Sequence, residues 1–211
     1  MRNLHPATIA IIIINVLVSM KGFNDSSFFE KYKFSIGGIK KGEQMRMISS
    51  AFLHANNQHL LFNMLSLYFF SNAVIYNLGV VSFIIIYAAS LLVGNLLSYY
   101  FHKNENHYSA VGASGSVSGI IYAGILLNPG MTINFIIPGW VFGVGYLLYS
   151  IYGMRAKNDN IGHDAHFGGA MGGFVATLLM APQLLQTSLL MVGLLSLPII
   201  ILFVMIKMGK L

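Results

Sequence analysis

The sequence predicts an all-α membrane protein, on the evidence of its composition and of the pattern of its apolar residues. Hydrophobic residues make up 56% of the 211 residues and charged residues only 9%, whereas a soluble chain carries about a quarter charged residues. The apolar residues are also gathered into blocks, each near the roughly 20 residues that cross about 30 Å of hydrocarbon. Such a chain cannot cover a water-facing surface, so we expect its helices to face lipid.

Seven apolar blocks are the candidate membrane spans. They cover residues 6–20, 59–78, 80–101, 114–128, 132–153, 163–181 and 184–206. The first block could instead be a signal peptide, but no small-residue cleavage site follows it, so a retained helix is the better interpretation. The stretch 21–57 is too rich in Phe, Met and Ile for a free linker. Its helix-like apolar spacing predicts a structured loop that lies partly in the membrane interface.

Charge and cysteine content exclude several classes of site and partner. The chain has no cysteine, which removes disulfides and thiolate metal sites. Its net charge of +6 comes from basic residues scattered through the loops. This distribution favours the lipid bilayer as a partner over nucleic acid. We therefore expect no nucleic-acid partner, and nothing in the sequence points to a cofactor.

Strongly polar residues occur at the starts of three spans, where such residues are costly and indicate function by default. His59 and Asn63 lie four residues apart and share one face of the second span. A Ser- and Gly-rich segment, 111–119, opens the fourth span, and 163–169, with two histidines, opens the sixth. Each segment alone has a structural explanation, such as close helix packing by small residues. Because alternation places all three on one side of the membrane, a shared cavity explains them together.

The fourth span is short in a way that favours a catalytic serine. A helix from Ser114 to just before Asn128 has about 14 residues and rises about 21 Å. Against about 30 Å of hydrocarbon, one end then lies roughly 9 Å inside. The backbone before Ser114 would be non-helical at that depth, which is tolerated only beside protein or a water-filled cavity. A serine at such a helix start suits a nucleophile, because the helix N-terminus stabilises developing negative charge.

Elimination leaves one chemistry for these polar residues. All six acidic residues lie outside the bodies of the spans, which excludes a two-aspartate protease and disfavours a carboxylate ion path. No HExxH motif occurs, and the segment 163–166 offers too few ligands to favour a zinc site. Asp164 is two residues from His166, on the opposite side of the helix, so it cannot easily complete a triad. A Ser114–His166 dyad remains, with the donors of the second span to bind an oxyanion.

With these residues in place, the sequence resembles the rhomboid intramembrane proteases from about residue 44 to residue 173. Three motifs support the resemblance, in order along the second, fourth and sixth spans: His54-x-x-x-x-His59-x-x-x-Asn63, Gly112-Ala113-Ser114-Gly115 and Ala165-His166-x-x-Gly169-x-x-x-Gly173. The resemblance implies a six-helix rhomboid core, residues 1–183, around a wet cavity. Residues 184–211 would then be an additional C-terminal transmembrane helix.

The resemblance also implies a role for each motif residue. Ser114 would be the nucleophile and His166 its general base. His59, Asn63 and Gly112, with the backbone N–H of the nucleophile, would form the oxyanion hole. Structural support near the site would come from His54, Arg46, Gly115, Gly169 and Gly173.

Two positions depart from the family pattern. Met45 stands where the family usually has Trp, which removes an interface anchor from the first loop. Ser118 stands four residues after the nucleophile, where an aromatic residue normally packs beside the catalytic histidine. Unless Tyr122 or Phe167 substitutes for that residue, we expect His166 to be less firmly oriented.

The function predicted in this way is that of an intramembrane serine endopeptidase that cleaves single-span transmembrane proteins, without a metal or cofactor. The alternative is a catalytically weak or inactive relative that binds membrane-protein clients, although this chain keeps the serine, the histidine and the oxyanion donors. A small-solute transporter is disfavoured, because the spans show neither paired half-helices in repeated positions nor buried charges.

The expected location is a cell membrane, the bacterial plasma membrane by preference, but two arguments about orientation disagree. The resemblance implies a cytoplasmic N-terminus and an active site that faces outward. That orientation leaves Arg2 as nearly the only basic residue on the cytoplasmic side, and the positive-inside rule favours the reverse. We follow the resemblance, because the rule is a statistical bias and acidic residues lie among the lysines of the first loop.

Overall fold

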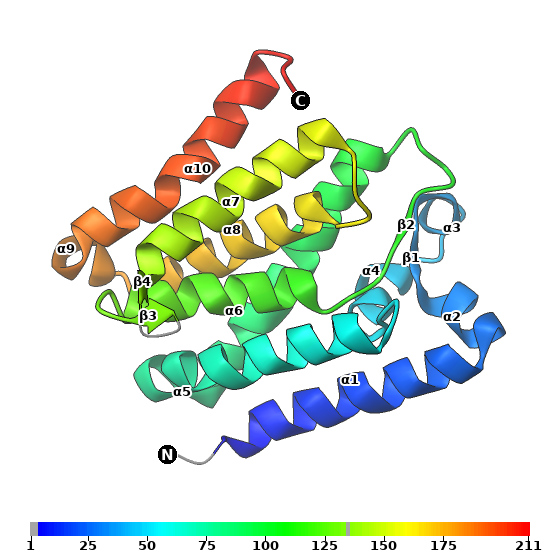
Figure 1. The fold of residues 1–211 in the computed structure, drawn as a ribbon, viewed down its shortest axis with the longest axis horizontal. Helices are drawn as coiled ribbons and strands as arrows, with labels where there is room; N and C mark the ends of the chain where they lie inside the picture. The colour runs from blue at the N-terminus through cyan, green and yellow to red at the C-terminus, as the bar shows by residue number, and fades with distance from the viewer. Residues whose placement is uncertain (1–3, 134–135) are drawn as a thin grey trace.

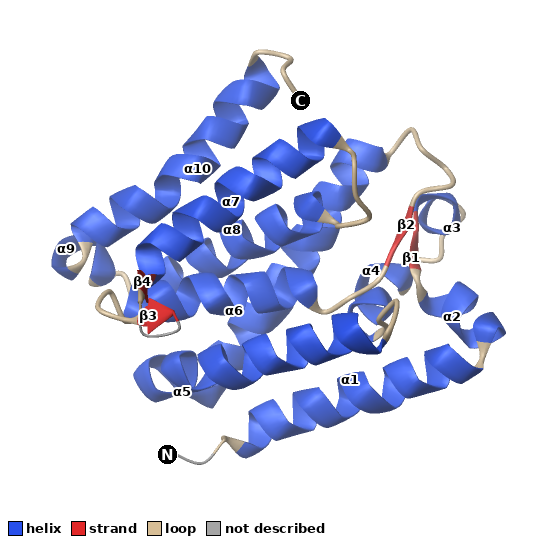
Figure 2. Cartoon of the chain, viewed as in Figure 1, coloured by secondary structure: helices blue, strands red, loops and turns tan. Residues whose placement is uncertain are grey.

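A computed structural model describes residues 4–133 and 136–211 of the protein. Figures 1 and 2 show that the described part of the chain is mainly helical, with long helices that pack side by side and short strands in the connections between them. The predicted all-α class is thus confirmed. The elements are α1 Pro6–Asn24, α2 Ser26–Tyr32, β1 Phe34–Ser35, α3 Ile36–Lys40, α4 Arg46–Ser49, the 3-10 helix η1 Ser50–Phe52, α5 Asn57–His102, β2 Ser109–Ala110, α6 Ser114–Leu127, β3 Thr132–Ile133, β4 Ile137–Pro138, α7 Gly139–Ala156, α8 His163–Met180, α9 Leu184–Thr187 and α10 Leu189–Lys207. By length and composition, three of the described helices can cross a membrane, namely α1, α5 and α10.

α5 contains the second and third predicted spans, joined at a single residue. It is 46 residues long, and its backbone leaves the helical region at Gly79, with φ 84° and ψ 167°. That region is open almost to glycine alone. The chain turns back there, so the first and last turns of α5 lie toward the same end of the molecule (Figure 1).

α6 is the buried centre of the fold, between α5 and α8 (Figure 1). Every residue from Gly115 to Leu126 is buried. α8 meets α6 backbone to backbone, because a Cβ added to Gly169 would overlap the carbonyl oxygen of Gly115, and one added to Gly173 would overlap the backbone of Gly119. The small residues of both helices therefore allow an approach that no larger side chain permits.

α7 and α10 form the outer layer on one side of α6 and α8 (Figure 1). Leu195 of α10 is fully buried, and its side chain lies 3.0 Å from where a Cβ of Gly143 would be. The Tyr122 hydroxyl of α6 donates a hydrogen bond of 2.8 Å to the carbonyl oxygen of Gly143. α6, α7 and α10 thus come together at Gly143.

The structure moves several predicted boundaries. The fifth span is predicted from residue 132, but its helix begins only at Gly139, because β3 and β4 pair Thr132 with Pro138 and disfavour a helix before the proline. The seventh block is divided at Ser188 into α9 and α10. At the other end of the chain, α1 continues to Asn24 before the first loop begins.

The first loop holds α2, β1, α3, α4 and η1. Its strand β1 pairs with β2, so that Phe34 lies opposite Ala110. Phe34, Ile36 and Ile39 form a small hydrophobic core of their own. Because β2 leads into α6, this pairing connects the first loop to the start of the central helix.

Candidate active site

Ser114 is the first residue of α6, and it is half-buried, whereas the helix from Gly115 to Leu126 is buried throughout. The first N–H groups of a helix have no acceptor within it. They carry partial positive charge and favour an anion beside them. The predicted nucleophile therefore lies where the central helix is accessible and where a developing negative charge is stabilised.

The ring of His59 lies against the backbone that leads into Ser114. Gly112 has φ 133°, a conformation that glycine adopts readily and other residues rarely. A Cβ on Gly112 would lie 2.9 Å from Nε2 of His59 and 3.5 Å from Oγ of Ser114. Glycine at this position therefore keeps open a small space that is bordered by the imidazole and the serine hydroxyl.

Hydrogen bonds orient both predicted oxyanion donors on α5. The backbone N–H of Ala55 donates to Nδ1 of His59 at 3.5 Å. The neutral ring then has its proton on Nε2, the atom that faces Gly112. Asn63 donates from Nδ2 to the carbonyl oxygen of His59 at 3.0 Å, and its amide has a second N–H to donate. The Asn56 side chain caps the helix by accepting from the His59 N–H at 2.8 Å.

His54 links α1 to the backbone just before α6. Ser19 donates from its hydroxyl to the carbonyl oxygen of Phe52 at 3.0 Å, and Nδ1 of His54 lies 2.8 Å from the same hydroxyl. Nε2 of His54 accepts from the backbone N–H of Ala113 at 3.4 Å, so Nδ1 has the proton and donates to Ser19. Burial, and then the charge of nearby His59, lower the pKa of His54 to about 3. The ring therefore stays neutral, as this pair of bonds requires.

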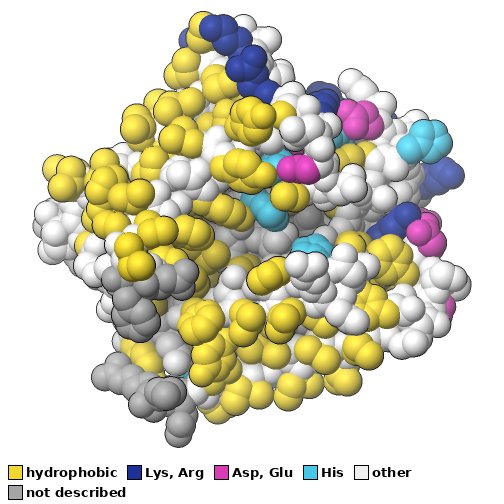
Figure 3. Space-filling model, in the orientation of Figure 1, with side chains coloured by type: hydrophobic (Ala, Val, Ile, Leu, Met, Phe, Trp, Pro, Cys, Tyr) yellow, Lys and Arg dark blue, Asp and Glu magenta, His cyan; other side chains and the backbone are white. Residues whose placement is uncertain are grey.

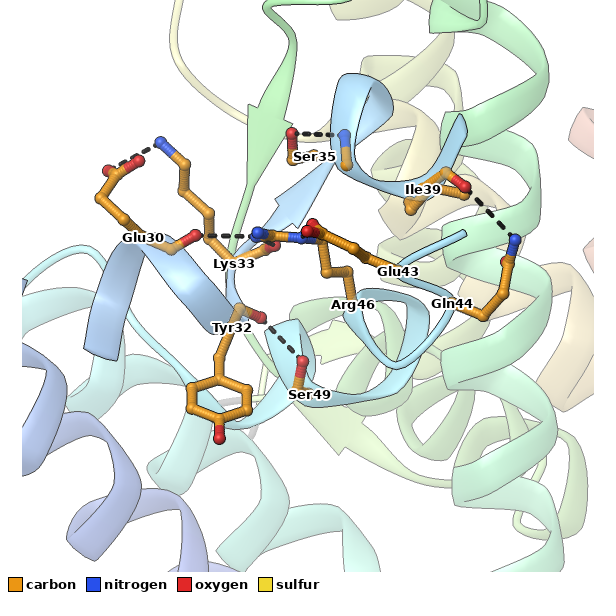
Figure 4. Close-up of polar contacts among 10 residues, drawn as sticks. Glu30, Tyr32, Lys33, Ser35, Ile39, Glu43, Gln44, Arg46 and Ser49 are labelled. Carbon is orange, nitrogen blue, oxygen red and sulfur yellow. Dashed lines mark hydrogen bonds and ion pairs between the residues drawn. The ribbon is translucent and has the colours of Figure 1, made fainter. Parts of the chain in front are cut away.

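Arg46 holds the first loop together (Figure 4). Its guanidinium donates to the carbonyl oxygens of Glu30 and Lys33, at 2.7 and 3.0 Å, and to the carboxylate of Glu43. These bonds join α2 and the segment before β1 to α4. Its neighbour Met45, which replaces the usual Trp, is 67% exposed and makes no comparable bond among the described residues.

His166 lies in the first turn of α8 and is half-buried. The preceding residue, Ala165, places its carbonyl oxygen 3.2 Å from where a Cβ of Gly115 would be, so this turn lies beside the start of α6. Within the described residues, no hydrogen bond joins the side chains of Ser114 and His166. Such a bond is often long in an enzyme without substrate and shortens when substrate binds.

The aromatic neighbour of His166 comes from α7, and this corrects the sequence analysis. Tyr122 points away, to the carbonyl oxygen of Gly143, and Phe167 belongs to the hydrophobic core. The ring of Tyr146 instead lies 5.9 Å from the His166 ring, with 22° between the planes. A tyrosine in the middle of a span needs a partner for its hydroxyl, and that is the signal that could have indicated Tyr146.

Asp164 points away from His166, toward the end of α5. Its carboxylate lies 3.4 Å from Nε2 of His102, in the last turn of α5. His102 in turn contacts Glu105 at 2.8 Å. This cluster joins the start of α8 to the end of α5.

Figure 3 shows the surface on this face hollowed between α7 and the first half of α5, over α6. Histidine side chains gather at its rim, and hydrophobic side chains cover the surface on both sides. The three polar segments predicted to share a cavity thus come from the starts of α5, α6 and α8, which lie at one end of the bundle.

The sequence profile of the Rhomboid domain matches residues 41–183. The chain belongs to the rhomboid family. It is 33% identical to YdcA of Bacillus subtilis, a candidate rhomboid protease, over 144 residues that make up 67% of this chain and 70% of that protein. It is also 28% identical to the mitochondrial RHOMBOID-like protein 12 of Arabidopsis thaliana over 183 residues, 77% of this chain and 54% of the relative. The rhomboid protease GluP of Bacillus subtilis is 32% identical over 143 residues, 65% of this chain and 26% of that protein.

Membership of the rhomboid family confirms the resemblance that the three motifs indicate, and this rhomboid is a multi-pass membrane protein. The chain spans about half the length of the Arabidopsis relative and about a quarter of GluP. Rhomboid proteins act on transmembrane substrates within the bilayer. Both bacterial and mitochondrial relatives occur, so family membership alone does not select one membrane.

Proposed function

We propose that this rhomboid is an intramembrane serine endopeptidase, with Ser114 as nucleophile and His166 as general base. The position of Ser114 supports this most, because it is the accessible first residue of a buried helix. In the reaction, Oγ of Ser114 attacks the peptide carbonyl while His166 takes its proton. His166 then gives that proton to the leaving amine, and water hydrolyses the acyl-enzyme.

The space that Gly112 keeps open is our proposed site for the oxyanion. Its donors would be Nε2–H of His59, the second amide N–H of Asn63 and the backbone N–H of Ser114. All three belong to residues whose orientation is fixed before a substrate arrives, which is the condition for strong electrostatic stabilisation. Asn63→Ala should therefore lower turnover on the order of 100- to 1000-fold, with the protein still folded in detergent.

Cleavage of a single-span transmembrane protein by the purified protein in detergent tests the dyad. Ser114→Ala and His166→Ala should each abolish cleavage, and the double variant should be hardly worse, because either loss disables the same step. Ser116→Ala, a buried serine on the same helix, is the matched control and should keep its activity. Cleavage by Ser114→Ala at the wild-type rate would rule out this mechanism.

A fluorophosphonate that reacts with activated serines separates the proposed protease from its alternative. It should label the wild type at Ser114, and labelling at Ser118 would move the nucleophile by one turn. A folded wild-type protein that is neither labelled nor active would favour a rhomboid that binds membrane-protein clients without cutting them.

We further propose the bacterial plasma membrane as the location, with the active site facing outward. The absence of cysteine in the sequence makes a direct test possible. A single cysteine at Asn24 or Asn106 in intact cells should react with a membrane-impermeant maleimide. Protection at both positions, together with labelling at Asn128, would show the reverse orientation that the positive-inside rule favours.

A further inference from the structure

We propose that Tyr146 of α7 positions His166, in place of the aromatic residue expected at position 118, and that Ser118 is the acceptor that holds it there. The proposal rests on the proposed function, since it concerns how the dyad is aligned. Tyr146 touches the base and takes no part in the bond changes, so it is a positioning residue.

The first observation is a column of three nearly parallel rings. Phe142 and Tyr146 lie one turn apart on α7, with ring centroids 6.0 Å apart and 9° between their planes. Tyr146 continues the column onto His166, at 5.9 Å and 22°. A flat neighbour on one face of the imidazole restricts its rotation, which is the degree of freedom that decides whether the ring faces Ser114.

The second observation is a chain of hydrogen bonds whose direction is fixed. The Ser118 hydroxyl donates its only proton to the carbonyl oxygen of Ser114, at 2.7 Å. Its oxygen also lies 2.6 Å from the hydroxyl of Tyr146, so Tyr146 must be the donor of that bond. Tyr146 therefore stacks on His166, and its hydroxyl is linked through the Ser118 hydroxyl to the carbonyl oxygen of Ser114.

The third observation is that the two placements of an aromatic residue exclude each other. Ser118 is buried, and its oxygen is already in hydrogen-bond contact with Tyr146. A large side chain at position 118 would overlap the hydroxyl of Tyr146. Ser118 therefore does more than remove an aromatic residue. Its small side chain leaves space for Tyr146, and its oxygen accepts the hydrogen bond from the Tyr146 hydroxyl.

Exchange of the two residues tests the proposal. Tyr146→Leu fills most of the volume without a flat ring, and we expect kcat to fall at least tenfold while KM stays within about twofold. Tyr146→Phe keeps the ring but loses the hydrogen bond to Ser118, so its kcat should lie between those of the wild type and Tyr146→Leu. Ser118→Tyr alone and Tyr146→Ala alone should each be strongly impaired, and the double variant Ser118→Tyr/Tyr146→Ala should be at least tenfold more active than either. Tyr152→Leu, an exposed tyrosine on the same helix, is the control.

The rate of labelling by a small fluorophosphonate should follow kcat through this series, because it reports the alignment of the dyad without a membrane substrate. Thermal unfolding in detergent shows which variants are folded, and Tyr146→Leu replaces Tyr146→Ala in the double variant if the latter does not fold. Wild-type kcat in Tyr146→Leu, or a double variant no better than its parents, overturns the positioning role and leaves the protease intact. A folded wild type that is neither active nor labelled overturns the proposed function itself, and the positioning role with it.

Discussion

Ser114 and His166 are held by contacts of two different kinds. The backbone before Ser114 is bonded to the first loop, since Gly112 donates to the carbonyl oxygen of Ser50 at 3.0 Å and Ala113 donates to His54. The ring of His166 has instead a side-chain neighbour, which comes from another helix. Ser114 is thus positioned by hydrogen bonds of the preceding backbone, and His166 by stacking on the ring of Tyr146.

Contacts of the first kind restrict the sequence more tightly than contacts of the second kind. A backbone contact without room for a Cβ accepts glycine alone, so its position in the motif is fixed. An aromatic ring can reach the same place from several positions, provided that its hydroxyl finds a partner. The glycines of the motifs are accordingly where the family pattern expects them, and the aromatic residue is not.

The largest effect should come from Gly169→Ala, which affects both supports because it separates α8 from α6. The new methyl group would overlap the carbonyl oxygen of Gly115, and backbone on both sides cannot move aside cheaply. We expect a loss of about 3 kcal/mol or more, seen as a fall in the detergent-solubilised melting temperature and a loss of labelling at Ser114. Gly145→Ala on α7 is the control, because its added Cβ has no described atom within 4 Å apart from the adjacent residues and backbone of its own helix. Equal stability of the two variants would mean that the helices are not closely packed.

An effect that is smaller as long as the pH stays above about 5 should come from protonation of His54, on the serine side. Its pKa is lowered to about 3 in the folded protein, from 6.5. The unfolded chain therefore takes up this proton first as the pH falls. The contribution to stability is complete above pH 6.5 and is lost progressively toward pH 3, by about 1.4 kcal/mol for each unit.

Thermal unfolding of the wild type and His54→Gln between pH 4 and 8 measures this contribution, because the other titrating groups are common to both proteins. The stability of the wild type should fall more steeply below pH 6.5 than that of the variant. Parallel curves would mean that the neutral His54 ring does not support the backbone before Ser114.

The smallest effect should come from Tyr122→Phe, on the histidine side. This change removes the hydrogen bond from α6 to the carbonyl oxygen of Gly143, one turn before Tyr146 on α7. We expect a loss of about 1 kcal/mol in stability and a fall in kcat of less than tenfold, through a looser α7. A larger fall in kcat than in Tyr146→Leu would place the main support of His166 at Tyr122 instead.

The helices and the three motif segments could be predicted from the sequence, because apolar blocks and misplaced polar residues are local signals. The pairing of β3 with β4 could not, since a short apolar strand and the first turns of a helix look alike in a hydrophobic block. The role of Tyr146 could not be predicted either. It depends on which face α7 turns toward α6, and that is decided by Gly143 and its contacts with Tyr122 and Leu195.

Gly79 has a consequence for how the protein is made. The two halves of α5 reverse direction at one residue, so no polar loop separates the second span from the third. We therefore expect the second and third spans to insert into the bilayer together, as a helical hairpin. A reporter domain fused after residue 79 would interrupt that hairpin before it closes. The side of the membrane on which the reporter is found would then describe the truncated chain and not the intact protein.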